Sequence, residues 1–192
     1  MPDAPQIALM RTLTGKPQSG YTLLELMTAI AILGILLGIA VPSFREYTRN
    51  SRATAAQNDL VTSLALARNE SLKRSRAVTV CASTDSLTCS GSTDWSTGWI
   101  VFTDGGTAGV VDAGIDALLQ VGSTGHPDVV LVSDTRGGAV ATSFLRYGPT
   151  GLLVPLARGS FDIYGTGCYG PNRLQFNVTP TGTPSVARVN CP

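Results

Sequence analysis

The spacing of hydrophobic and polar residues changes twice along the chain. Residues 21–41 form an apolar run in which Glu25 is the only charged residue. Residues 42–76 then show the i, i+3, i+4 spacing of an amphipathic helix, with its stripe at Phe44, Tyr47, Leu60, Val61, Leu64, Ala67, Arg68 and Leu72. After residue 77 this spacing gives way to short segments in which hydrophobic and polar residues alternate. The pattern predicts one long helix with two different halves, followed by a β-rich region.

The apolar run is long enough to cross a membrane. At about 1.5 Å per residue, residues 21–41 span about 30 Å, the thickness of a bilayer's hydrocarbon core. The run is longer than the apolar core of a secretory signal peptide, and no A-x-A cleavage site follows it. We therefore expect a single-pass transmembrane helix over residues 21–41. Basic residues flank it on both sides, so the positive-inside rule leaves its orientation open.

The second half, residues 42–76, is expected to continue the helix outside the membrane. Pro42 removes one backbone hydrogen bond, which predicts a kink or a local unwinding at this position. We expect the helix to end near the basic cluster of residues 73–76, because cations stabilise the negative end of a helix. Capping and solvation explain that cluster; the alternative is contact with lipid headgroups or with a neighbouring subunit.

Eight segments beyond residue 77 have the composition of strands and are separated by Gly, Pro, Ser and Thr. A helix with an apolar stripe needs a partner to cover that stripe. The expected fold class is therefore α+β, with residues 77–192, here called the head, packed on the second half of the helix. We expect one of Trp95 and Trp99 in the core and the other at the rim, since Trp99 opens a strand. The eight segments are residues 77–82, 98–104, 117–122, 129–133, 143–148, 161–165, 173–179 and 185–190.

The four cysteines form two well-separated pairs without a C-x-x-C motif. Disulfides in an oxidising compartment explain this pattern better than a structural zinc site, since His126 is the only histidine. Three connectivities are open, and we expect the local one, Cys81–Cys89 and Cys168–Cys191, because it closes the shortest loops. Disulfides also place the head outside the cytoplasm.

Charge is distributed unevenly, although the net charge is only +1. Residues 77–135 contain seven aspartates and no Lys or Arg, whereas residues 136–192 contain five arginines and one acidic residue, Asp162. The overall composition gives no sign of a nucleic-acid-binding protein. The asymmetry instead indicates oppositely charged surfaces for partners.

Few residues have the arrangement that metal binding or catalysis requires. Asp104, Asp112 and Asp116 lie in an acidic turn without the alternating oxygen ligands and closing Glu of a calcium loop, so no metal site is expected. His126 is not accompanied by a nucleophile motif such as G-x-S-x-G. We therefore expect no enzymatic activity and no cofactor.

Glu25 is the residue of the apolar run that most needs an explanation. A carboxylate in lipid costs on the order of 2.5–3.5 kcal/mol near the helix centre, less toward an end, and usually has a partner. Glu25 either reaches the headgroup region or pairs with a positive charge. Residues 21–41 contain no Lys or Arg, so a pairing charge must come from another chain.

The stretch SGYTLLELM, residues 19–27, resembles the class III signal of type IV pilins and type II secretion pseudopilins. Gly20 matches the last residue of the leader, Glu25 matches the acidic fifth residue of the mature chain, and Tyr21 stands where Phe is usual. The resemblance implies that a prepilin peptidase removes residues 1–20 and methylates the amine of Tyr21. It also implies that Glu25 pairs with the N-terminal amine of a neighbouring subunit.

The head resembles the GspH/FimT family of minor pilins and pseudopilins. The similar features are the cysteine after the first strand, Asp94-Trp95, Gly98-Trp99, the acidic turn, and the segments LRYGPTGLLV and ARVNC. The resemblance implies a type IV pilin-like fold and a non-enzymatic structural subunit near the tip of a type II secretion pseudopilus or a type IV pilus. The features used here are common to both filaments.

The resemblance also implies a domain order, a location and partners. Residues 1–20 are the leader, 21–41 the transmembrane helix, 42–76 the amphipathic half and 77–192 the head. The expected location is the inner membrane, with the head in the periplasm, and then the filament. The implied partners are the prepilin peptidase, other pilins or pseudopilins, an inner-membrane assembly platform and the lipid bilayer.

DNA is the alternative partner. Some FimT-like proteins bind DNA during natural transformation through a C-terminal Gly-Arg-x-Arg motif, and the matching place here reads Ala-Arg-Val-Asn, residues 187–190. Only the first arginine, Arg188, is retained. A basic face could be completed by the other arginines of the C-terminal region, Arg136, Arg146, Arg158 and Arg173, whose phosphate contacts would make binding depend steeply on salt.

Overall fold

The structure, a computed structural model, describes residues 20–134, 141–156 and 158–192. Its described residues divide into two compact units at the boundary between Val41 and Pro42. Helix α1 (Leu23–Arg74) has 52 residues and contributes to both units. The helix is continuous through Pro42. Of the two alternatives expected there, local unwinding is therefore wrong, and a kink stays a prediction.

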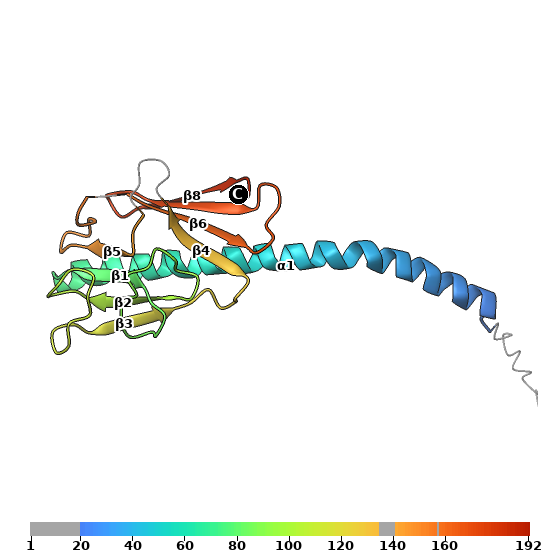
Figure 1. Cartoon of the computed structure of the whole chain (residues 1–192), viewed down its shortest axis with the longest axis horizontal. Coiled ribbons are helices and arrows are strands. Elements are labelled where there is room, and N and C mark those ends of the chain that lie inside the picture. The colour runs from blue at the N-terminus through green and yellow to red at the C-terminus, as the bar shows by residue number, and fades with distance from the viewer. Residues whose placement is uncertain (1–19, 135–140, 157) are drawn as a thin grey trace, which may run out of the picture. The chain divides into compact units, whose positions relative to one another are not determined.

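The head consists of two antiparallel sheets (Figure 1). All eight predicted strands are confirmed, with small shifts at their ends. The first sheet has the order β3-β2-β1-β5 and the second has the order β4-β6-β7-β8. The strands are β1 (Val78–Ala82), β2 (Trp99–Thr103), β3 (Leu118–Gly122), β4 (Val129–Asp134), β5 (Phe144–Tyr147), β6 (Gly159–Gly165), β7 (Arg173–Val178) and β8 (Pro184–Val189).

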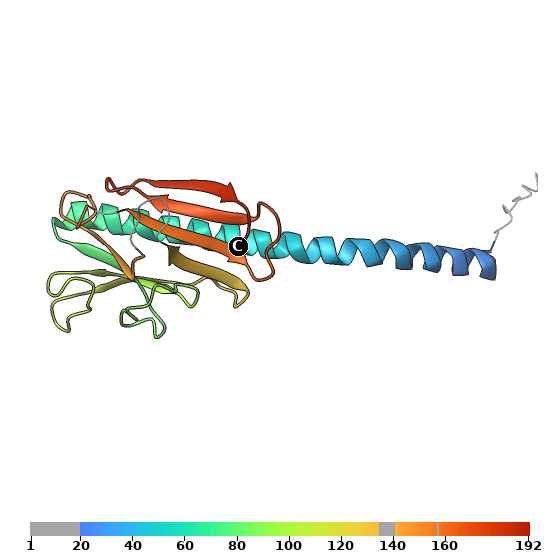
Figure 2. The same cartoon turned by 45° about the horizontal axis from the view of Figure 1, so that its top comes forward.

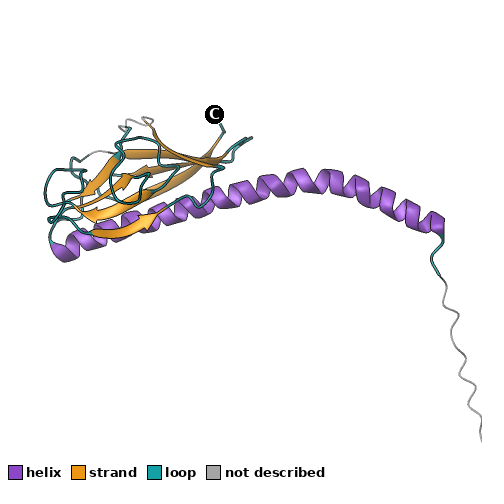
Figure 3. Ribbon diagram, turned by 60° about the horizontal axis from the view of Figure 1, so that its bottom comes forward, coloured by secondary structure: helices purple, strands orange, loops and turns teal. Residues whose placement is uncertain are grey.

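The second half of α1 supplies one wall of the core (Figure 3). Its buried side chains are mostly small, which lets both sheets approach the helix closely. They join strand residues of both sheets in one hydrophobic cluster, in which the ring centroids of Trp95 and Phe161 lie 5.1 Å apart, edge to face. The buried helix residues are Ala53, Ala56, Gln57, Leu60, Ser63, Leu64, Ala67 and Ser71.

Two expectations about the core need correction. Phe44 and Tyr47 remain 69% and 70% exposed, because the buried face of the helix begins only at Ala53. Both tryptophans are fully buried, so neither lies at a rim. Trp95 is drawn inside because the segment that carries it pairs with β4, where Trp95 N donates to Leu131 O at 2.8 Å.

Trp99 is held between the helix and β3. Its indole Nε1 donates a hydrogen bond of 2.8 Å to the Ser63 hydroxyl of α1. Gly122 lies against the other side of the indole, and a Cβ added there would come within 2.3 Å of the ring nitrogen. A side chain at position 122 would therefore displace Trp99 from the core.

Candidate functional site

The start of α1 is a capping box formed by Thr22 and Glu25. The Glu25 carboxylate accepts hydrogen bonds from the Thr22 backbone N–H at 3.1 Å and its hydroxyl at 3.2 Å. In return, the Glu25 N–H donates to the Thr22 hydroxyl at 3.2 Å. This reciprocal arrangement satisfies donors that the first helical turn leaves unpaired. The capping box was not among the predictions made from the sequence, although the T-x-x-E spacing is a recognised signal for a helix start.

The first half of α1 is apolar on all sides. Its 18-residue window of highest hydropathy averages 2.4, and none of that window is buried inside the structure. Length and composition therefore allow this helix to cross a membrane. Leu23, Ile30 and Leu36 are examples of the large side chains left exposed. A helix that is hydrophobic all round needs lipid or other helices around it.

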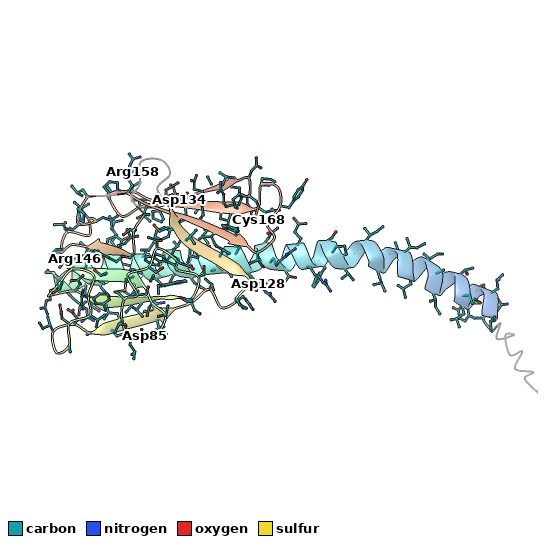
Figure 4. The ribbon with its side chains drawn as sticks, viewed as in Figure 1. Asp85, Asp128, Asp134, Arg146, Arg158 and Cys168 are labelled. Atoms are coloured by element: carbon teal, nitrogen blue, oxygen red, sulfur yellow. A yellow bond between two sulfur atoms is a disulfide. The ribbon has the colours of Figure 1, made fainter. Side chains whose placement is uncertain are left out.

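Three polar side chains of α1 hold the loops at one end of the head. The Arg49 guanidinium donates to Thr166 O at 2.8 Å, and Arg52 forms an ion pair with Asp128 at 2.8 Å. Asp128 lies beside α1 in Figure 4. A hydrogen bond to its own backbone and the contact with Arg52 lower the pKa of Asp128. Glu46 accepts a hydrogen bond of 3.0 Å from Asn172.

Both disulfides of the expected local pairing are present. Cys81 pairs with Cys89, and Cys168 pairs with Cys191. The first closes a loop in which hydrogen bonds from Thr88 lower the pKa of Asp85. The second ties the residues after β8 to the loop that precedes β7, and Cys191 N also donates to Gly170 O at 2.9 Å. The C-terminal end of β8 is therefore fixed in place.

The acidic turn is held together by its own hydrogen bonds. Asp104 is fully buried, accepts a hydrogen bond from Thr79 at 2.5 Å and forms an ion pair with Arg146 at 3.2 Å. Asp116 accepts a hydrogen bond from the Gly105 backbone at 2.8 Å, and Asp112 accepts one from Thr107 N at 2.6 Å. The carboxylates organise the loop backbone, and no group of three or more metal-ligating side chains occurs among the described residues.

The arginines of the C-terminal region do not form one free basic surface. Arg173 is buried and pairs with Asp162 at 3.2 Å, and Arg146 is engaged by Asp104. Arg158 and Arg188 are exposed and form no ion pair with any described residue (Figure 4 labels Arg158). Arg136 lies outside the described residues. The expected contact of Arg173 with DNA therefore conflicts with its position, because its guanidinium is buried against a carboxylate.

Tyr147 is a buried titratable group without a hydrogen-bond partner for its hydroxyl among the described residues. Burial raises its pKa to about 12. The ring closes the core beside Gly182, where an added Cβ would come within 2.7 Å of it. His126 lines an open surface pocket together with Ser96, Thr97 and its loop neighbours 123–125 and 127. No described cysteine is free to act as a nucleophile beside it.

Comparison with known protein families gives two matches. Residues 56–182 match the family described as type II transport protein GspH, and residues 15–41 match the prokaryotic N-terminal methylation motif. Among curated proteins, a fimbrial protein of Pseudomonas aeruginosa is 44% identical over 45 residues, which are 23% of this chain and 29% of that protein. The type IV major alpha-pilin of Moraxella bovis is 46% identical over 43 residues, 22% of this chain and 27% of that protein. The chain thus spans less than a third of the length of these relatives.

Among solved structures, the type IV minor pilin FimU of Pseudomonas aeruginosa aligns with a TM-score of 0.55 at 20% identity, over 73% of this chain and 92% of FimU. The minor pseudopilin EpsH from the type 2 secretion system of Vibrio cholerae aligns with a TM-score of 0.41 at 14% identity, over 70% of this chain and 94% of EpsH. The likeness to FimU shows the fold, a long N-terminal helix packed on antiparallel sheets.

Proposed function

The chain belongs to the GspH family of type II transport proteins, and on that premise we propose how this structural subunit enters its filament. Prepilin peptidase cleaves after Gly20 and methylates the new amine of Tyr21. The mature subunit stays in the inner membrane through residues 21–41, with its head in the periplasm, until the assembly platform transfers it to a place near the filament tip. Its activity is assembly rather than catalysis.

The observation that carries this proposal is the first half of α1. It combines the N-terminal methylation motif with a run of exposed apolar side chains and a single carboxylate, Glu25, in the first helical turn. Lipid covers such a surface before assembly, and neighbouring helices cover it afterwards. Pairing of Glu25 with the amine of Tyr21 in a neighbouring subunit would let each charge neutralise the other and so lower the cost of burying both in the apolar filament interior.

Processing is tested by mass spectrometry of the N-terminus. The protein recovered from membranes and from filaments should begin at a methylated Tyr21. Gly20→Ala serves as the processing control: it should retain residues 1–20 and fail to enter filaments. A wild-type chain that is assembled with Met1 intact would contradict the proposal.

DNA uptake is the second candidate function, and it rests on the two exposed arginines, Arg158 and Arg188. Its test is DNA affinity at two salt concentrations, about 50 and 200 mM, for the full chain in detergent and for Arg188→Ala. Each lost phosphate contact should reduce the salt dependence by about one unit in the logarithmic slope. Absence of binding at the lower salt concentration would exclude DNA as a partner.

A further inference from the structure

Three aromatic side chains beyond residue 41 are mostly exposed. Phe44, Tyr47 and Tyr169 are 69%, 70% and 82% exposed, whereas every other aromatic side chain described in residues 42–192 is buried or half-buried. Single exposed apolar residues are ordinary on a protein surface, but a group of them at one place marks an interaction surface. The question is therefore whether these three residues lie together.

Tyr169 lies on the loop between β6 and β7, and this loop is bonded to α1. The Asn172 side chain donates hydrogen bonds to Glu46 at 3.0 Å and to the Tyr169 carbonyl at 2.7 Å. Figure 1 and Figure 2 both show the loop beside the helix. Tyr169 is therefore close to the level of Phe44 and Tyr47 along α1.

The exposure of Tyr169 does not come from a loosely held loop. The Cys168–Cys191 disulfide ties the loop to the residues after β8. On the side of the helix, the Arg49 guanidinium donates a hydrogen bond of 2.8 Å to Thr166 O. Ordering a loop costs conformational entropy. These contacts thus hold a tyrosine in an exposed position that the core of the head does not use.

Helix geometry places this level in the headgroup region of a membrane crossed by residues 21–41. At about 1.5 Å per residue, Phe44 lies about 4.5 Å beyond Val41, Glu46 about 7.5 Å and Tyr47 about 9 Å. The headgroup region adds about 5–7.5 Å on each side of the hydrocarbon core. Side chains of a helix lean toward its N-terminus, so both aromatic rings of the helix reach back into this region.

The exposed rings lie on different sides of the helix, which favours a lipid surface over a single protein partner. Phe44 and Tyr47 are about 60° apart around α1. Glu46, to which the loop is bonded, is about 200° from Phe44. One protein partner covers one side of a helix, whereas the surface of a bilayer surrounds a helix that leaves it. Lipid can therefore cover all three rings at once.

We propose that Tyr169 and its loop contact lipid headgroups at the place where α1 leaves the membrane. Tyrosine suits this place because its ring is apolar and its hydroxyl hydrogen-bonds to headgroups and water. Phe44 and Tyr47 complete the contact, and the exposed Arg45 reaches a lipid phosphate. The head then rests on the membrane in a fixed orientation before assembly, without a second copy of the chain.

The inference rests on the proposed function, since it requires residues 21–41 to lie in a membrane. Tryptophan fluorescence of the full chain in lipid vesicles tests it. Tyr169→Trp keeps an aromatic residue suited to the interface, and Trp95 and Trp99, both fully buried, give a constant background. The vesicles contain equal parts of phosphatidylcholine and phosphatidylglycerol, with a quenching nitroxide on some headgroups or quenching bromine on some acyl chains.

Two control positions lie on either side of Tyr169 along the helix. Ile30→Trp, near the middle of the apolar run, reports whether that run is in the membrane. Ile115→Trp replaces a side chain that is 54% exposed at the other end of the head. Ile115 and Arg76 both lie beside Gly105, so this end is about 40 Å along the helix from the Tyr169 loop. Unchanged thermal unfolding shows that the head of each variant remains folded.

The headgroup nitroxide should quench the added emission of Tyr169→Trp several-fold more than that of Ile115→Trp. The brominated chains should quench Ile30→Trp most. If Ile30→Trp is quenched but Tyr169→Trp is quenched no more than Ile115→Trp, the loop does not contact lipid and the inference is wrong, whereas the proposed function stands. If Ile30→Trp is not quenched either, the membrane anchor of the proposed function is itself contradicted.

Discussion

The two halves of α1 belong to one helix but satisfy opposite requirements. In residues 23–41 every described side chain is exposed, and large aliphatic residues occur all round. In residues 42–74 the buried positions recur on one face and are mostly small or aliphatic. The first half is stable only with apolar surroundings supplied from outside the chain. The second half obtains them from its own head.

This difference separates folding from assembly. The core of residues 42–192 includes strands from both sheets and one helix face, so its stability should not depend on the first half. Mutations in the second half of α1 should therefore change the stability of the head, whereas mutations in the first half should change assembly into the filament. Matched substitutions in the two halves can test that separation.

The largest effect is expected from truncating a buried leucine. Leu60 is fully buried in the core cluster, so Leu60→Ala should lower the free energy of unfolding of the head by about 2–5 kcal/mol. Leu36→Ala, which changes a 57% exposed residue, should leave it unchanged. Denaturant unfolding of both chains in detergent measures this, and equal losses would contradict the separation.

Ionisation of Tyr147 should weaken the head at high pH. Its folded-state pKa of about 12 lies above the ordinary value of 10, so the unfolded chain releases the proton first as the pH rises. The contribution of Tyr147 to the free energy of unfolding should be fully present below about pH 10. It should then fall by up to about 1.4 kcal/mol per pH unit until about pH 12. Tyr147→Phe should remove this slope, and an unchanged slope would assign it to other groups.

Enlarging a small helix residue should lower the free energy of unfolding of the head by less than truncating Leu60 does. Ala67 is fully buried between helix and sheets, so Ala67→Leu should destabilise the head by about 1–3 kcal/mol through overpacking. Ala31→Leu changes an exposed residue of the first half and should leave the melting temperature of the head unchanged. A stabilising Ala67→Leu substitution would indicate looser packing than the structure has.

The smallest effect is expected at the ion pair between Arg52 and Asp128, which is partly exposed. Arg52→Ala should lower the free energy of unfolding only slightly, because solvent screens a partly exposed ion pair. Because the pKa of Asp128 is lowered in the folded state, its contribution is present above the ordinary carboxylate pKa and is lost as the pH falls below it. The difference between wild type and variant should therefore shrink in acid, and a growing difference would contradict this assignment.

Much of the fold could be predicted from the sequence because its local signals agree. Alternation bounded by Gly and Pro located the eight strands, and the shortest loops gave both disulfides. The sequence could not show that β5 joins β1, or that residues 93–96 close the edge of β4, because these contacts form between distant segments. Trp95 is buried for the same reason.

The candidate site was predictable only in part. The run from Gly20 to Val41 can be recognised from spacing alone, whereas the environment of each arginine depends on tertiary contacts. Arg173 was expected at a surface, yet Asp162 of the neighbouring strand holds it in the interior. The T-x-x-E spacing predicts the capping role of Glu25, whereas the cost of a carboxylate in lipid predicts a partner in another chain.

The most direct measurement compares Glu25→Gln with Glu25→Ala in filament incorporation, with processing at Tyr21 followed by mass spectrometry. Gln at the third helical position can still complete a capping box with Thr22, whereas Ala cannot. If the charge of Glu25 pairs with a neighbouring amine, both variants should be processed and both should fail to enter filaments. Normal incorporation of Glu25→Gln together with failure of Glu25→Ala would show that Glu25 acts as a helix cap and would contradict the intersubunit pair.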